Sequence, residues 1–253
     1  MKADMTTEDE PWPVLRRLTA ARIGLKRAGA SLATAPLLDF RLAHARARDA
    51  VHEPLDATRL TADLTGLGVP IIAVASAAED RQTYLMRPDF GRRLAANANV
   101  ALAAHHGDYD VVFVVADGLS ARAVALHARP VLSHALPVLQ AEGWKLAPLV
   151  IVRHGRVAVG DAIAAALGTA CVAVLIGERP GLSAPHSMGA YLTFKPHAGT
   201  TDAQRNCISN IRPEGIGYDV AGFKIAHLLR AMRAQRLSGV QLKDESNRLP
   251  IGR

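Results

Sequence analysis

The sequence has few aromatic residues and few cysteines. Phe, Trp and Tyr make up 4% of the 253 residues, whereas proteins that bind single-stranded nucleic acid usually stack the bases on aromatic rings. The only cysteines are Cys171 and Cys207, and they form no C-x-x-C pair. This scarcity indicates a reducing compartment rather than a disulfide framework. We see no secretory signal, so we predict a cytoplasmic protein.

Long apolar runs are missing as well. No run approaches the roughly 18 residues that a bilayer-spanning helix needs, so we predict a soluble chain with no membrane partner. The residues are nevertheless 49% hydrophobic, enough to bury a large core. Ala, Leu, Val and Ile dominate this fraction, which favours helices packed on a sheet.

The chain is basic, with a net charge of +7 and a pI of about 9.8. Such a charge is compatible with nucleic acid or with an acidic protein partner. The basic residues are dispersed, however, at spacings typical of solvated helix faces, and no basic tract is interleaved with aromatics. We therefore predict no nucleic-acid partner.

The first quarter of the chain contains only helical patterns. Residues 1–11 are polar, and we expect them to be unstructured. Apolar residues then recur at helical spacing over 12–27 and 34–52, and a third helix is predicted from Asp56, as its N-cap, to about residue 66. These patterns predict an N-terminal helical region over residues 1–66.

Beyond residue 66, short apolar runs alternate with helical patterns. The predicted strands are 70–75, 109–116, 148–152, 169–176 and 188–194. The predicted helices are 88–104, 119–142 with interruptions at Pro130 and Pro137, 161–168 and 219–237. Apolar strands that alternate with helices are typical of a parallel sheet buried on both faces. We therefore predict an α/β fold, with a Rossmann-like, mostly parallel sheet flanked by helices over residues 67–253.

Polar groups follow three of these strands. Parallel sheets bind ligands beyond the carboxyl ends of their strands, where this sequence places Asp117-Gly118, residues 153–156 and Gly177-Glu178-Arg179. We favour Asp117 as a helix cap over Asp117 as a ligand acceptor. Glu178 fits an ion pair with its neighbour or a ligand contact equally well, and Pro180-Gly181 stiffens the turn that follows it.

Several catalytic motifs are absent. The sequence contains no G-x-G-x-x-G after a strand, no phosphate-binding P-loop and no complete nucleophile elbow. His105-His106 has no second cluster to complete a metal site, so we predict a surface loop there. Cys207 lacks an identifiable histidine partner, and its spacing favours a small buried apolar side chain over a nucleophile.

Six ordered segments, which together span nearly the whole chain, resemble the small subunit of ethanolamine ammonia-lyase. They are TAARIGLKRAGASLATAPLLDFRLAHARARDAVH (19–52), YLMRPDFGRRL (84–94), VVFVVADGLSARAV (111–124), VRHGRVAVGD (152–161), IGERPGLS (176–183) and RNCISNIRPEG (205–215). The resemblance implies an adenosylcobalamin-dependent enzyme that converts ethanolamine to acetaldehyde and ammonia by a radical mechanism. It also implies a hetero-oligomer, in which a large barrel subunit holds the substrate and the small subunit covers the other face of the corrin.

The resemblance also implies the cofactor contacts. In this sequence they are Val157 in HGRVAVG, Glu178 in GERPG and Cys207 in RNCISN. The corrin carries amide side chains, whose NH₂ groups suit the Glu178 carboxylate and whose carbonyls suit backbone N–H groups near Val157 and Cys207. The family keeps the cofactor's own base on cobalt, and this sequence lacks the D-x-H-x-x-G pattern of proteins that replace that base. We therefore predict neither a catalytic residue nor a metal ligand in this chain.

Two alternatives to this assignment stay open at this point. One is a free-standing α/β binding protein or small-molecule enzyme, and the other is a nucleic-acid-binding module suggested by the +7 charge. Location inside a bacterial microcompartment is also open. Some members of the family carry a long targeting extension, whereas here about a dozen mostly polar residues precede the first predicted helix.

Overall fold

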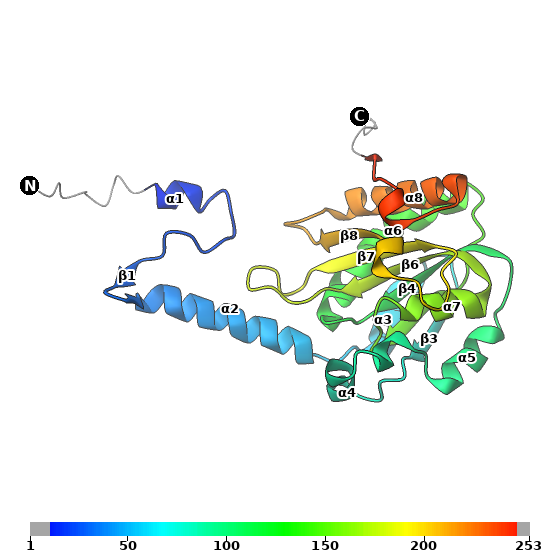
Figure 1. The fold of residues 1–253 in the computed structure, drawn as a ribbon, viewed down its shortest axis with the longest axis horizontal. Helices are drawn as coiled ribbons and strands as arrows, with labels where there is room; N and C mark the ends of the chain where they lie inside the picture. The colour runs from blue at the N-terminus through cyan, green and yellow to red at the C-terminus, as the bar shows by residue number, and fades with distance from the viewer. Residues whose placement is uncertain (1–10, 247–253) are drawn as a thin grey trace, which may run out of the picture.

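A computed structural model describes residues 11–246; the segment predicted to be unstructured lies outside these residues, except for Pro11. Figure 1 shows a layered α/β body from which a helical arm projects. The arm contains α1 (Trp12–Leu15), β1 (Arg27–Ala28), β2 (Ser31–Leu32) and α2 (Thr34–His52). The body contains α3 (Ala57–Leu64), β3 (Ile71–Ala75), α4 (Arg81–Met86), η1 (Phe90–Arg92), α5 (Ala96–Ala103), β4 (Tyr109–Ala116), α6 (Ala121–Ala141), β5 (Leu149–Arg153), α7 (Val159–Leu167), β6 (Thr169–Gly177), β7 (Met188–Phe194), η2 (Asp202–Gln204), β8 (Asn206–Ile211), α8 (Tyr218–Gln235) and η3 (Gly239–Gln241).

The main sheet is mixed and mostly parallel. Its strand order is β3-β5-β4-β6-β7-β8. The first four strands are parallel to one another, and β7 and β8 add an antiparallel edge. Val114 of β4 lies opposite Val150 of β5 and Val174 of β6. The predicted α/β class, with helices flanking a mostly parallel sheet, is confirmed.

Both faces of the sheet are covered, because alternate residues of each central strand enter two different cores. Val111, Phe113 and Val115 of β4 pack in one core with residues of α3, α6 and α8. Val112 and Val114 face α5 and α7 on the other side. Burial on both faces explains why the fully buried stretches of these strands are apolar.

The structure corrects several predicted elements. α6 is continuous through Pro130 and Pro137; the ten buried residues along it outweigh the cost of the lost backbone hydrogen bonds. The single helix predicted over 88–104 is wrong, because that segment holds η1 and α5. The sequence patterns also missed α4, which Asp80 caps by accepting a hydrogen bond from the Thr83 amide at 2.7 Å.

The N-terminal part differs most from the prediction. The helix expected over 12–27 ends at Leu15, because the chain folds back on itself. The Arg16 guanidinium donates hydrogen bonds to the carbonyls of Ile23 and Gly24. Gly24 has a φ of +55° and lies directly against the Trp12 indole. In contrast, α2 begins and ends as predicted, and Asp56 caps α3 by accepting from the Arg59 amide at 2.9 Å.

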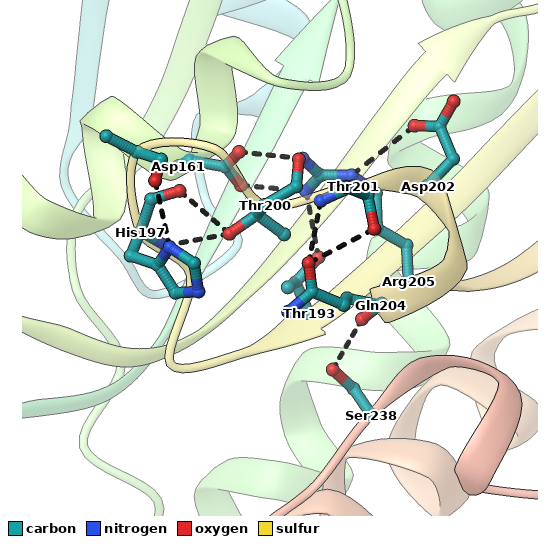
Figure 2. Close-up of polar contacts among 10 residues, drawn as sticks. Asp161, Thr193, His197, Thr200, Thr201, Asp202, Gln204, Arg205 and Ser238 are labelled. Atoms are coloured by element: carbon teal, nitrogen blue, oxygen red, sulfur yellow. Dashed lines mark hydrogen bonds and ion pairs between the residues drawn. The ribbon is translucent and has the colours of Figure 1, made fainter.

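A buried ion pair joins α7 to the loop before β8. Figure 2 shows the Arg205 guanidinium against the Asp161 carboxylate, with two parallel hydrogen bonds of 2.7 Å. Arg205 also donates to the Thr193 hydroxyl and to the Thr200 carbonyl, each at 3.1 Å. Both charged residues are buried, at 6% and 7% exposure. This pair fixes the start of α7 relative to the antiparallel edge.

Candidate functional site

A cavity of about 430 Å³ lies beyond the carboxyl ends of β4, β5 and β6. β4 lies between the other two strands. The helix that follows β4 covers one face of the sheet, and the helix that follows β5 covers the opposite face. Where two neighbouring connections leave to opposite faces in this way, a crevice opens in which α/β proteins bind ligands. The cavity is lined by Tyr84, Gly118, Leu119, Arg156, Val157, Ile176, Gly177, Glu178, Arg179 and Tyr191.

Two glycines allow the loops at this edge to meet. The Leu119 amide donates to the Gly177 carbonyl at 2.9 Å. Gly118 has a φ of +55°, and a Cβ at this position would lie 2.3 Å from the Gly177 carbonyl oxygen. A Cβ at position 177 would lie 2.1 Å from the Ser120 carbonyl oxygen. This backbone contact fixes the point at which β6 leaves the sheet and Glu178 begins the next loop.

The Glu178 carboxylate is half-buried and held by backbone groups. It accepts a hydrogen bond from the Asn210 amide at 3.1 Å, and the Glu178 amide donates to the Ser187 carbonyl at 3.0 Å. A Cβ at position 189 would lie 2.9 Å from a carboxylate oxygen of Glu178, so the glycine found there leaves space for the Glu178 side chain. Among the described residues, no ion pair joins Glu178 to Arg179. The carboxylate therefore keeps lone pairs that can accept from a ligand.

Val157 also lines the cavity, just before α7. The Arg156 amide donates to the Gly91 carbonyl at 2.7 Å and anchors this loop. The amides of Val157 and Ala158 find no acceptor in the described part of the chain. Free N–H groups at a helix start are ready donors to a carbonyl or an anion. The cavity lining thus includes Val157, which has a free backbone donor, and the Glu178 carboxylate.

Tyr84 forms part of the cavity lining between two guanidinium groups. Its ring lies 4.8 Å from the Arg81 guanidinium and 4.4 Å from that of Arg156, and its hydroxyl donates to the Gly155 carbonyl at 3.3 Å. Burial raises the pKa of Tyr84 to about 12, so the phenol stays neutral. The sequence patterns assign no role to Arg81 or Tyr84, because both lie on α4, a helix that those patterns do not predict.

Asp117 does not cap a helix, which corrects the prediction. Its buried carboxylate accepts from the Gly155 amide at 3.0 Å and lies 3.5 Å from the Arg81 guanidinium. Burial raises the pKa of Asp117, while hydrogen bonds from the backbone at His154 and Gly155 and the charge of Arg81 oppose that rise. Asp117 therefore joins the ends of β4 and β5 beneath the cavity.

Cys207 lies on β8 opposite Tyr191 of β7. Its side chain is exposed, so the predicted buried position is wrong: β8 is an edge strand, and Cys207 points to its open face. Partial desolvation of the sulfur raises the pKa of Cys207, whereas a hydrogen bond from the Tyr191 hydroxyl opposes that rise. Cys207 does not line the cavity, but it contacts Tyr191, which does. The structure thus brings Val157 and Glu178 to one cavity and places Cys207 beside it.

Over residues 11–246, no three His, Cys, Asp or Glu side chains come together in a way that could hold a metal ion. His105 and His106 are exposed, as predicted for a surface loop. None of the helices in the same residues has the length and apolar character to span a membrane.

The fold and the cavity define an α/β protein with a candidate ligand site at the switch point of a mostly parallel sheet. The chain matches the family described as ethanolamine ammonia-lyase light chain over residues 9–243. It is 54% identical over 242 residues to the ethanolamine ammonia-lyase small subunit of Azotobacter vinelandii, covering 94% of this chain and 90% of that protein. It is 52% identical over 256 residues to the small subunit of Xanthomonas campestris pv. campestris strain B100, with 100% and 94% coverage.

The chain therefore belongs to the ethanolamine ammonia-lyase small subunit family. This confirms the resemblance found in the sequence. As a small subunit of a lyase it works with a large subunit, which argues against the free-standing α/β protein kept as an alternative.

A second cavity, of about 550 Å³, lies beside the loop after β6 and contains a histidine that should make stability depend on pH. His127 is 5% exposed. Its Nε2–H donates to the His186 carbonyl at 2.8 Å, so Nδ1 accepts from the Tyr218 hydroxyl at 2.9 Å. Burial lowers the pKa of His127, which means that the folded chain resists protonation of this ring.

Because the pKa of His127 is lower in the folded state, the unfolded chain binds more protons below about pH 6.5. We expect the free energy of unfolding to fall between pH 7 and pH 5, and to fall less steeply in His127→Gln, which keeps a donor and an acceptor. Urea unfolding at several pH values measures both slopes. His186, whose pKa burial also lowers, should retain part of the slope. Identical slopes in the two proteins would contradict the role of His127.

Proposed function

We propose that this chain binds adenosylcobalamin at its contact with the large subunit and orients it there. The assembled enzyme converts ethanolamine to acetaldehyde and ammonia by a radical mechanism, and the large subunit, a barrel, holds the substrate. The observation that carries this proposal is the Glu178 carboxylate, held at the carboxyl end of β6 in a cavity that it shares with Val157.

The residues present fit the periphery of a corrinoid. The cavity volume of about 430 Å³ is in the lower part of the range for drug-sized ligands, so it cannot enclose a corrin with its nucleotide. It can receive amide side chains of the corrin rim. The Glu178 carboxylate would accept from an amide NH₂, and the free amides of Val157 and Ala158 would donate to an amide carbonyl. The bulk of the cofactor would then lie outside this chain, where a second subunit can cover it.

The cofactor, when bound, supplies the radical chemistry. The role of this chain is to bind and orient, and we assign no catalytic residue to it. We propose that the cofactor keeps its own base on cobalt. In support, none of the described residues that line the cavity is a histidine.

We propose a Rossmann-like cofactor domain over residues 67–253, preceded by the helical region 1–66. Most of the cavity comes from the loops after β4, β5 and β6, which all lie in the larger part. We place the assembled enzyme in the cytoplasm, either free or inside an ethanolamine-utilising bacterial microcompartment.

Glu178→Ala tests the cofactor site. With the large subunit present in excess, we expect adenosylcobalamin affinity to fall by about tenfold to a hundredfold, the effect of losing a hydrogen bond to a charged group. Absorbance titration with adenosylcobalamin measures the affinity. Glu178→Gln should fall between wild type and Glu178→Ala, because an amide oxygen still accepts. Glu79→Ala, at an exposed position that does not line the cavity, is the matched control. Unchanged affinity in Glu178→Ala would exclude this assignment.

A further inference from the structure

The N-terminal arm, residues 11–52, packs little on the rest of the chain. Figure 1 shows α2 leaving the body, with α1 and the β1–β2 hairpin at its far end. α2 is about 28 Å long, from the rise of an α-helix. Its buried residues are Ala47 and Ala50, near its C-terminal end, where the Arg81 guanidinium also donates to the Val51 carbonyl at 2.7 Å. From residue 11 to residue 46, no described side chain is buried.

The arm exposes an unusual share of apolar side chains. Of the fifteen large hydrophobic residues that are exposed among the described residues, eight lie in the arm: Trp12, Val14, Leu15, Leu18, Leu32, Leu38, Phe40 and Leu42. Leu38 and Leu42 are 57% and 51% exposed and lie one helical turn apart on the same face of α2. Clustered apolar exposure of this kind marks an interaction surface.

The arm is also strongly basic. It contains eight Arg or Lys residues but only two acidic residues, Asp39 and Asp49. Arg41, Arg46 and Arg48 flank the Leu38–Leu42 face, and all three are exposed. Arg48 has only a distant ion pair with Asp49, at 3.8 Å. An acidic rim around an apolar groove would complement this surface.

We infer that the arm is a second docking surface for the large subunit, separate from the cofactor cavity. Leu38 and Leu42 insert into an apolar groove, and the flanking arginines meet acidic groups at its edge. This inference rests on the proposed function, because the partner is the large subunit of the same enzyme. It adds that a segment outside the cofactor domain carries much of the subunit affinity.

Electrostatics disfavours a second copy of this chain as the occupant. Two arms would bring like charges together, and residues 53–253 also contain more basic than acidic side chains. Like-charge contacts oppose association.

The arm is also large enough for a stable interface. Such an interface needs about 800 Å² from each partner, and an extended arm of this length can supply that area.

The test compares the variant Leu38→Glu/Leu42→Glu with the control Val100→Glu/Val240→Glu. The control residues are 75% and 77% exposed but lie on the body. The full-length chain and its large subunit are mixed without cofactor, and the dissociation constant is measured by sedimentation. We expect the arm variant to weaken association by about tenfold or more, as for loss of interface hot spots. Circular dichroism of the small subunit should not change.

Unchanged association in the arm variant, or equal loss in the control, would overturn the inference. So would self-association of the small subunit alone that the arm variant abolishes, because the arm would then serve a second copy. The cofactor proposal fails separately: it predicts loss of adenosylcobalamin affinity in Glu178→Ala at saturating large subunit, a result that does not depend on how the arm docks.

Discussion

Arg205→Met should lower the free energy of unfolding by about 3–5 kcal/mol, the usual cost of removing one partner from a buried ion pair. The substitution leaves the Asp161 carboxylate buried without the two hydrogen bonds of 2.7 Å that it accepts in the native chain. It also removes the donors to Thr193 and Thr200. Urea unfolding of the purified full-length chain, followed by circular dichroism, measures the change.

Two further variants separate the ion pair from general disruption. Arg205→Met combined with Asp161→Leu should recover most of the lost stability, because an apolar pair of similar volume avoids an unpaired buried charge. Lys145→Ala removes an exposed pair with Asp108 and should leave stability unchanged within error. If the double variant is no more stable than Arg205→Met, the lost stability comes from the missing hydrogen bonds and packing of Arg205, and not from the unpaired charge of Asp161.

The position of this pair gives it a role in the site. Asp161 lies in the first turn of α7, directly after the Val157 loop, and Arg205 precedes β8, which carries Cys207. The pair thus connects two of the three predicted cofactor contacts from beneath. This explains why a charged pair in the core is compatible with the fold: its directional hydrogen bonds fix one arrangement of α7 and β8.

The central strands could be predicted from the sequence because burial on both faces makes most of each strand apolar; in β4 every residue from position 111 to position 116 is buried and apolar. β4 begins and ends as predicted, and β6 extends one residue further than predicted. β8 could not be predicted in this way. It is an edge strand in which only Ile208 and Ile211 are buried. The polar residues between them leave neither an apolar run nor a regular alternation of apolar and polar residues. The prediction of a helix over 12–27 was wrong because Arg16 donates hydrogen bonds to the carbonyls of residues 23 and 24, which a continuous helix would place too far away.

The site was only partly predictable. The rule that ligands lie at strand ends indicated Glu178 and the loop before α7, and the family resemblance specified Val157. The supporting residues come from elsewhere: Tyr84 of α4 and Tyr191 of β7 line the cavity, and the Arg81 guanidinium, also on α4, lies 4.8 Å from the Tyr84 ring. No spacing in the sequence connects these segments, since their contact depends on the tertiary fold.

Gly177→Ala should lower the free energy of unfolding by about 3 kcal/mol, the upper end of the range for overpacking. The new Cβ would lie 2.1 Å from the Ser120 carbonyl oxygen and 2.6 Å from that of Asp117. Both atoms belong to the backbone between β4 and α6, so no side-chain rotation relieves the contact. The two loops must separate, and the Leu119 to Gly177 hydrogen bond of 2.9 Å is lost with them.

Gly181→Ala is the matched control, four residues away in the same loop. A Cβ there would have its nearest neighbour, the Ala184 carbonyl oxygen, at 3.7 Å, so stability should change by less than about 0.5 kcal/mol. Because Gly177 sets the position of Glu178, Gly177→Ala should also weaken adenosylcobalamin binding in the assembled enzyme, whereas Gly181→Ala should not. A Gly177→Ala protein that is destabilised yet binds the cofactor normally would show that the Glu178 carboxylate is placed by its contact with Asn210 on β8, and not by the point at which β6 leaves the sheet.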